Sequence, residues 1–140
     1  MTPDLADTLE FQLRAVGEKI TFFVSGQPVP KQSFRKTKTG GYTDPKVTAW
    51  QDTVGYTAKE IIKDPLKGNV SVKMFFYLAD NRVVDLDNLS KAVLDGLKGI
   101  AFGDDCMVTR LLLTKEVRKD NPGVLIALSE IEQYLERSEG

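Results

Sequence analysis

The chain contains no histidine and a single cysteine, Cys106, among its 140 residues. Without histidine there is no histidine general base, no Ser-His or Cys-His nucleophile pair and no histidine-ligated zinc. One cysteine cannot form an internal disulfide or a thiolate zinc site, and it fits a reducing cytoplasm. A metal bound by this chain would therefore be a hard cation held by oxygen atoms, such as Mg²⁺ or Mn²⁺.

Long apolar runs are also missing. No stretch approaches the roughly 20 apolar residues needed to cross a bilayer, and the first residues lack the basic and apolar regions of a secretory signal. Hydrophobic residues make up 41% of the chain and charged residues 28%, as in a soluble globular protein. A chain of 140 residues is suited to one domain. We therefore expect a cytoplasmic protein that does not interact with a membrane.

The net charge of −1 is distributed unevenly along the chain. Residues 1–18 and 130–140 each hold four acids against one arginine, so each end carries −3 and residues 19–129 carry +5. A basic body suits a nucleic-acid partner, although modest asymmetry of this kind is common in other proteins too. We expect an arm or short helix over 1–18, the folded domain over 19–129, and an acidic tail over 130–140 with a short helix from 131 to 137.

Apolar periodicity predicts an α+β domain in the order β-α-β-α-β-β, with a mixed sheet of four or five strands and two main helices. Asp44 and Pro45 are a typical helix start, and Asn88 or Asp87 is expected to cap the second helix. Trp50 is more suited to the core than to a ligand site. The predicted strands cover 19–25, 70–78, 107–117 and 124–128, the last two as a hairpin, and the predicted helices cover 45–63 and 89–98.

A basic loop follows the first strand. Residues 31–42 hold four cations, no acid, and two aromatic residues around Gly40-Gly41. Cations with interleaved aromatic residues suit phosphate contact and base stacking, and the same composition is equally that of a solvated loop. Phe34 and Phe102 are candidates for stacking on bases, and Phe102 is at least as well suited to the core. The residues expected to contact DNA phosphates are Lys31, Arg35, Lys36 and Lys38.

Carboxylates are concentrated between residues 85 and 105. In an extended segment Asp85 and Asp87 would face the same way, and two adjacent carboxylates repel each other unless a cation lies between them. A helix of ten or eleven residues and the six residues after it allow Asp105 to return beside that pair. Three converging carboxylates suit one or two Mg²⁺ ions, which activate water and stabilise charge on a phosphodiester.

A lysine lies within the same segment. Lys91 follows Asp87 by four residues and precedes Asp95 by four, so the three share one edge of the predicted helix. Helix capping and surface salt bridges would explain these three residues without any catalytic function. They explain Asp85 and the pair Asp104-Asp105 poorly, which favours a metal site.

Two other ligand-binding motifs are excluded by individual residues. An EF-hand loop starting at Asp85 would have Leu89 at its fifth position, Ser90 in place of glycine and Gly96 in place of the final glutamate. Gly40-Gly41 is not followed by the Gly-Lys-Ser/Thr of a phosphate-binding loop. The sequence therefore does not predict a calcium-binding loop or a nucleotide-binding loop of these kinds.

At these residues the sequence resembles the RusA family of Holliday-junction resolvases. The family pattern is Asp-x-Asp-Asn-x-x-Lys, then an Asp about four residues later, then an Asp-Asp pair. The likeness covers roughly residues 19–129. The matching residues are Asp85-Leu86-Asp87-Asn88-Leu89-Ser90-Lys91, Asp95 and Asp104-Asp105, with Gly26-x-Pro28-x-Pro30-Lys31, Tyr42-x-Asp44-Pro45 and Lys115 elsewhere.

The resemblance implies an endonuclease that uses Mg²⁺, with Mn²⁺ as a substitute, and cuts four-way DNA junctions as a homodimer by paired symmetric nicks in recombination and repair. Two alternatives stay open: a nuclease acting on flaps, forks or duplex DNA, and a non-catalytic DNA-binding module of the same fold. The implied residues are Asp85, Asp87 and Asp105 as metal ligands, Asp104 as an auxiliary ligand, Lys91 as the catalytic lysine, and Asn88 and Asp95 as supporting residues.

Overall fold

The computed structural model describes residues 13–32, 36–37, 40–41 and 44–133. The predicted α+β class is confirmed, with one domain, a four-stranded mixed sheet and two main helices in the predicted order. None of the helices described here is long and apolar enough to cross a bilayer. The elements are β1 (Leu13–Ser25), β2 (Lys36–Thr37), β3 (Gly40–Gly41), α2 (Pro45–Ile61), β4 (Asn69–Leu78), α3 (Leu86–Leu97), the 3₁₀ turn η1 (Asp105–Met107), β5 (Val108–Val117) and β6 (Gly123–Gln133).

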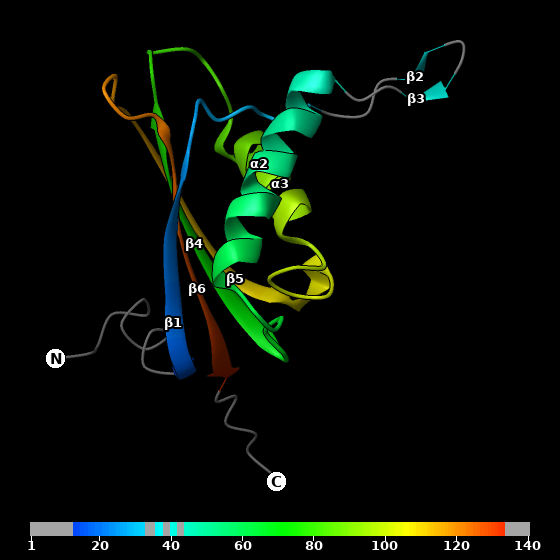
Figure 1. Ribbon diagram of the computed structural model, residues 1–140, viewed down its shortest axis with the longest axis vertical. Helices are drawn as coiled ribbons and strands as arrows, with labels where there is room; N and C mark the ends of the chain where they lie inside the picture. Colours follow the sequence, from blue (N-terminus) through cyan, green and yellow to red (C-terminus); the bar gives the residue numbers. More distant parts are fainter. Residues whose placement is uncertain (1–12, 33–35, 38–39, 42–43, 134–140) are drawn as a thin grey trace, which may run out of the picture.

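The four long strands form one sheet in the order β1-β6-β4-β5. Strand β6 is antiparallel to both of its neighbours, whereas β5 runs parallel to β4. A parallel pair needs a crossover connection, and α3 with the turn after it provides that connection. Figure 1 shows α2 and α3 together on one face of the sheet, where α3 contacts both α2 and β5.

The sequence prediction was wrong about residues 13–18 and 131–133 and about the pairing of the last two strands. Strands β5 and β6 do not form a hairpin, because β6 inserts between β1 and β4. The apolar residues 124–128 are largely buried, as a central strand requires, whereas β5 is an exposed edge strand. Residues 13–15 and 131–133 pair with each other in β1 and β6, and residues 16–18 also lie in β1, so none of them is helical. The remaining end residues, 1–12 and 134–140, lie outside the described residues.

The core lies between the sheet and the two helices. Alternate residues of β4, including Met74 and Phe76, are fully buried and face the helices. Trp50 of α2 is buried there, as predicted. Phe102, in the turn after α3, is also fully buried in the core cluster, so its side chain is not available to stack on DNA bases. The core therefore fixes α3 and the turn that follows it, the two segments that carry the acidic residues.

The first helix starts where the sequence predicts, and it approaches α3 closely. The side chain of Asp44 accepts the backbone N–H of Lys46 at 2.9 Å, and Pro45 occupies the first helical position. On α3, a Cβ added at Gly96 would lie 2.7 Å from the backbone oxygen of Gln51. Only glycine allows this approach, which brings Gln51 of α2 next to the acidic face of α3.

Candidate active site

Helix α3 begins three residues earlier than predicted. Asp85 is its N-cap, with extended backbone angles (φ −83°, ψ 134°), and Asp87 lies in its first turn. The expectations that Asp87 or Asn88 caps the helix, and that Asp85 and Asp87 occupy equivalent positions of an extended chain, are therefore wrong. The physical reason is Leu86, which packs against the core and belongs to the helix.

The two carboxylates at this helix start have weak contacts. Asp85 makes no side-chain capping bond, and its Oδ2 is 3.5 Å from the Nδ2 of Asn88. The predicted ion pair between Asp87 and Lys91 is present at 3.4 Å, but the Asp87 side chain is 74% exposed. An exposed pair of this kind contributes only about 0.3–0.5 kcal/mol. Both carboxylates and the lysine are therefore accessible to a ligand and are easily rearranged.

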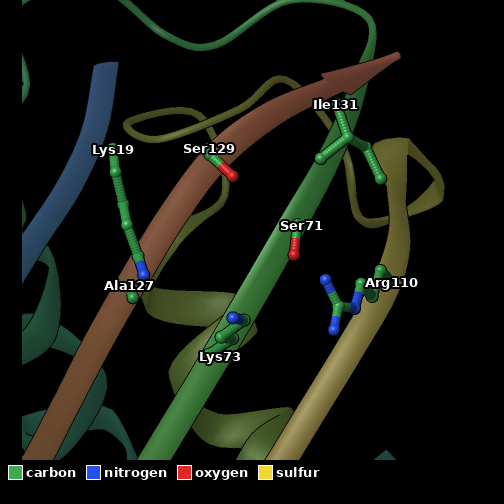
Figure 2. Close-up of a pocket in the computed structure, with 7 residues that line it drawn as sticks. All are labelled: Lys19, Ser71, Lys73, Arg110, Ala127, Ser129 and Ile131. Carbon is green, nitrogen blue, oxygen red and sulfur yellow. The ribbon is translucent and has the colours of Figure 1, made fainter. Parts of the chain in front are cut away.

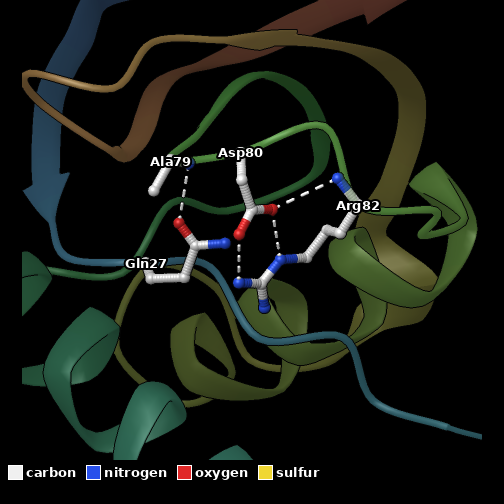
Figure 3. A network of polar contacts seen from close by, with 4 residues as sticks. All are labelled: Gln27, Ala79, Asp80 and Arg82. Atoms are coloured by element: carbon white, nitrogen blue, oxygen red, sulfur yellow. Dashed lines mark hydrogen bonds and ion pairs between the residues drawn. The ribbon is translucent and has the colours of Figure 1, made fainter.

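The loop from β4 to α3 is held by a polar network, shown in Figure 3. Arg82 donates from Nε and Nη2 to the two carboxylate oxygens of Asp80, at 2.7 and 2.8 Å. These bonds hold the pKa of the Asp80 carboxyl below its usual range. Gln27, just after β1, accepts the backbone N–H of Ala79 at 2.9 Å. The network gives the loop a defined path toward Asp85.

A lysine on β5 fixes the last residue of this loop before the helix. The Nζ of Lys115 donates to the backbone carbonyl of Val84 at 2.5 Å, directly before Asp85. Lys115 is one of the residues that match the family pattern, but the sequence did not indicate a role for it. Its contact links the edge strand to the start of α3 and so helps to position Asp85.

Lys31 contacts both ends of α3, and Gln51 contacts its C-terminal end. The backbone N–H of Lys31 donates to the carbonyl of Asn88 at 2.9 Å, and its Nζ lies 2.5 Å from Oδ2 of Asp95. The Nε2 of Gln51 donates to the same carboxylate oxygen at 3.3 Å. Asp95 is thus held by Lys31 and Gln51, and its predicted support of Lys91 stays a prediction. The sequence analysis missed Gln51, and the glycine beside Asp95 was the available signal of a close helix contact.

The neighbours Asp104 and Asp105 lie in opposite electrostatic environments. Asp104 accepts the backbone N–H of Asp105 at 2.7 Å and pairs with Lys98 at 3.5 Å, and these contacts lower its pKa. Burial raises the pKa of Asp105, and repulsion from Asp95 adds to the effect. The buried Oδ1 of Asp105 has no hydrogen-bond partner among the described residues. The charged form of Asp105 is therefore disfavoured where it stands.

The acidic residues are spread along α3 rather than collected at one point. Two of them, Asp95 and Asp104, both raise the pKa of Asp105. In the parts of the chain that the structure describes, no three acidic or cysteine side chains are arranged to hold a metal ion. The predicted ligand set therefore stays a prediction.

The chemistry of these residues nevertheless fits a hard divalent cation. A buried carboxylate oxygen without a partner is uncommon and points to a missing ligand. A cation beside Asp105 would supply that partner and would offset the repulsion from Asp95. The donors nearby are carboxylate oxygens, which Mg²⁺ and Mn²⁺ prefer.

The predicted DNA-contacting residues fall in different places. Lys31 contacts α3, as described above, and Lys36 lies in β2, which pairs with β3. Figure 1 shows this short hairpin projecting beyond the end of α2. Arg35, Lys38 and the stacking candidate Phe34 lie outside the described residues. The structure thus turns one of the four predicted phosphate contacts, Lys31, toward the acidic site.

Fold and site together define a class of small α+β domain in which a crossover helix and the turn after it carry an acidic site. Comparison with protein families identifies this class more closely: residues 25–129 match the family of the endodeoxyribonuclease RusA. Because this match covers most of the chain, the protein belongs to the RusA endodeoxyribonuclease family, and the predicted resemblance is confirmed. A search of curated proteins found no match.

Proposed function

We propose that this protein is a Mg²⁺-dependent endonuclease that resolves four-way DNA junctions by paired symmetric nicks during recombination and repair. Membership of the RusA endodeoxyribonuclease family supports cleavage of DNA, with junctions as the substrate. The observation that carries the proposal is Asp105, whose buried oxygen lacks a partner beside further carboxylates. Such a group suits a cation site better than a purely structural role, because a structural carboxylate would be paired.

Asp85, Asp87 and Asp105 would hold the cation, with Asp104 as an auxiliary ligand. When bound, a divalent cation supplies a Lewis acid for phosphodiester hydrolysis. The weak contacts of Asp85 and Asp87 leave both free to turn toward Asp105. Asp105 must be deprotonated to act as a ligand, and a cation favours that form against burial.

Lys91 is the proposed catalytic lysine. Its exposed ammonium group is restrained only by the long ion pair with Asp87. It can therefore move to a phosphate oxygen and stabilise the negative charge that develops there in the transition state. With Asp87 as a ligand of a divalent cation, the Lys91 ammonium group would be free of that partner and available to the substrate.

The proposed substrate and the proposed homodimer are linked by symmetry. A four-way junction with two equivalent strands is matched by a two-fold dimer, which presents one site to each of those strands. The hairpin of β2 and β3, with the surrounding basic segment 31–42, is the candidate phosphate contact. Its projection away from the domain would allow it to reach DNA beside the acidic site.

The test is cleavage of a labelled synthetic junction, a matched flap and a matched duplex in Mg²⁺. We expect paired nicks with 5′-phosphate and 3′-hydroxyl ends in the junction, and loss of cleavage in Asp87→Asn. Full cleavage by Asp87→Asn would contradict the metal site. Preferred cleavage of the flap would instead identify a structure-selective nuclease, and binding without cleavage by the wild type would identify a DNA-binding module.

A further inference from the structure

The sheet face opposite the two helices contains a cavity of about 150 Å³. Its residues alternate with the core residues of the same strands, so they face away from α2 and α3. Figure 2 shows the strands from this side, with the helices behind them. Residues from all four long strands line it, among them Lys19, Ser71, Lys73, Arg110, Ala127 and Ser129.

The register of the sheet builds this cavity around Ser71. Ser71 is paired with Ser129 on β6 and with Arg110 on β5, so the three side chains lie in one row across the sheet. Lys73 lies two residues further along β4, on the same face. In Figure 2, Lys19 extends from β1 toward Ala127 and closes the row from the other side. Cations therefore lie on both sides of a central pair of hydroxyls.

The polar groups of the cavity are not compensated within the described residues. As whole residues Ser71 and Ser129 are 3% and 9% exposed, and neither hydroxyl forms a hydrogen bond with another described residue. Lys19 and Lys73 likewise form no ion pair within those residues. Among the described residues no carboxylate lines the cavity, and Arg110, which has an interaction of its own, adds a third cation. Around this cavity the described residues therefore offer hydroxyl and ammonium donors but no anionic acceptor.

A tetrahedral oxyanion supplies what the cluster lacks. The volume equals that of roughly five water molecules in the liquid, which is enough for one phosphate group. Hydroxyl and ammonium groups are hydrogen-bond donors, and bonds from charged donors to phosphate oxygens are stronger than those between neutral groups. We propose that this cavity binds a phosphate group, supplied either by free inorganic phosphate or by a DNA phosphodiester.

The proposed site is separate from the candidate active site. The sheet itself lies between the cavity and α3, so the two sites cannot share a ligand or a cation. The proposal consequently does not depend on nuclease activity. It can be tested without a divalent metal, and failure of either proposal leaves the other unaffected.

The first test titrates the protein with inorganic phosphate in chelator-containing buffer at constant ionic strength, followed by the backbone amide signals of Ser71 and Ser129. We expect a saturable change in the wild type. Lys73→Gln should weaken binding about tenfold, since a charge-assisted hydrogen bond is lost. Ser71→Ala should weaken it by a smaller factor. Lys59→Gln, which removes an exposed lysine of α2, should titrate like the wild type.

The second test distinguishes the two sources of phosphate with a short DNA duplex under the same metal-free conditions. Weaker duplex binding by Lys73→Gln, but not by Lys59→Gln, with a reduced salt dependence, identifies the DNA backbone as the ligand. Unchanged duplex binding with weakened phosphate binding identifies free phosphate. Absence of a saturable phosphate response in the wild type, or identical titrations of wild type and Lys73→Gln, overturns the proposal.

Discussion

The two ends of α3 hold their acidic residues in contrasting ways. At the first end Asp85 and Asp87 are exposed, and their contacts with neighbouring side chains are weak. At the other end Asp95 contacts Lys31 and Gln51. Asp105 is partly buried, and its Oδ1 has no hydrogen-bond partner among the described residues. The difference supports a division of roles within the proposed site. Asp105 would define the position of the cation, and Asp85 and Asp87 would complete its coordination.

The largest expected effect is the loss of junction cleavage when an acidic residue at either end of α3 is replaced. If both belong to one cation site, Asp85→Asn and Asp105→Asn should each lower junction cleavage by about a thousandfold, because each removes a charge from the reacting centre. The measurement is single-turnover cleavage in saturating Mg²⁺. Asp64→Asn, an exposed acid between α2 and β4, is the matched control and should cleave like the wild type. Loss of cleavage in one variant alone would separate the two ends.

Lys31 should have an intermediate effect, because it acts through Asp95. Lys31→Ala should lower cleavage by about 10- to 100-fold, the range seen when a residue that supports a metal ligand is removed, because Lys31 and Asp95 both act on the charge of Asp105. Lys31→Arg should restore most of the loss, since arginine can also pair with Asp95. The measurement is the cleavage rate at saturating junction, with affinity determined separately. A loss confined to affinity, without any fall in rate, would make Lys31 a phosphate contact as the sequence predicts.

Gly96 tests the packing that places Gln51 beside Asp95. Gly96→Ala should lower the free energy of unfolding by about 1–3 kcal/mol, since its Cβ would meet the backbone of α2. Gly103→Ala is the control, because its Cβ would make only an ordinary contact with Met107 at 3.6 Å. Denaturant unfolding measures both. Equal stability of the two variants would show that the helices move apart without penalty.

The smallest expected effect is on the thermal stability of the cation-free protein when Asp104 or Asp105 is replaced. The pKa of Asp105 is raised in the folded protein, so the free energy of unfolding falls as the pH rises from the ordinary pKa of 3.8 through the pKa of the folded state. At pH 7 the ionised Asp105 is therefore destabilising. Asp105→Asn should therefore raise Tm by about 1–3 °C. The lowered pKa of Asp104 gives the opposite sign, a contribution present above 3.8 and lost at lower pH, so Asp104→Asn should lower Tm. Tm shifts of the same sign in Asp104→Asn and Asp105→Asn would contradict the opposite electrostatic environments of these two carboxylates.

Local patterns predicted the parts of the fold that depend on neighbours in sequence. The start of α2 followed from Asp44 and Pro45, and the pairing of Asp87 with Lys91 followed from their helical spacing. The position of β6 did not follow, because a short turn before it suggests a hairpin whereas burial of both its faces requires a central place in the sheet. Strand order is set by that tertiary packing rather than by the turn.

The acidic residues of the candidate site could be proposed from the sequence, but their contacts could not be predicted. The spacing from Asp85 to Asp105 predicts a ligand set, which stays a prediction. The partners of Asp95, which are Gln51 and Lys31, lie far from it in the sequence. They reach it only because α2 and the segment that follows β1 pack against α3. The unpaired oxygen of Asp105 likewise depends on burial, which no local pattern encodes.

The most direct test of a single cation site at α3 is paramagnetic broadening of amide signals by substoichiometric Mn²⁺. One site predicts that the signals of Asp87 and Asp105 broaden together at the same Mn²⁺ concentration, and that Asp105→Asn abolishes both effects. Broadening at Asp87 alone, or its persistence in Asp105→Asn, would contradict the view that the two ends of α3 hold one cation.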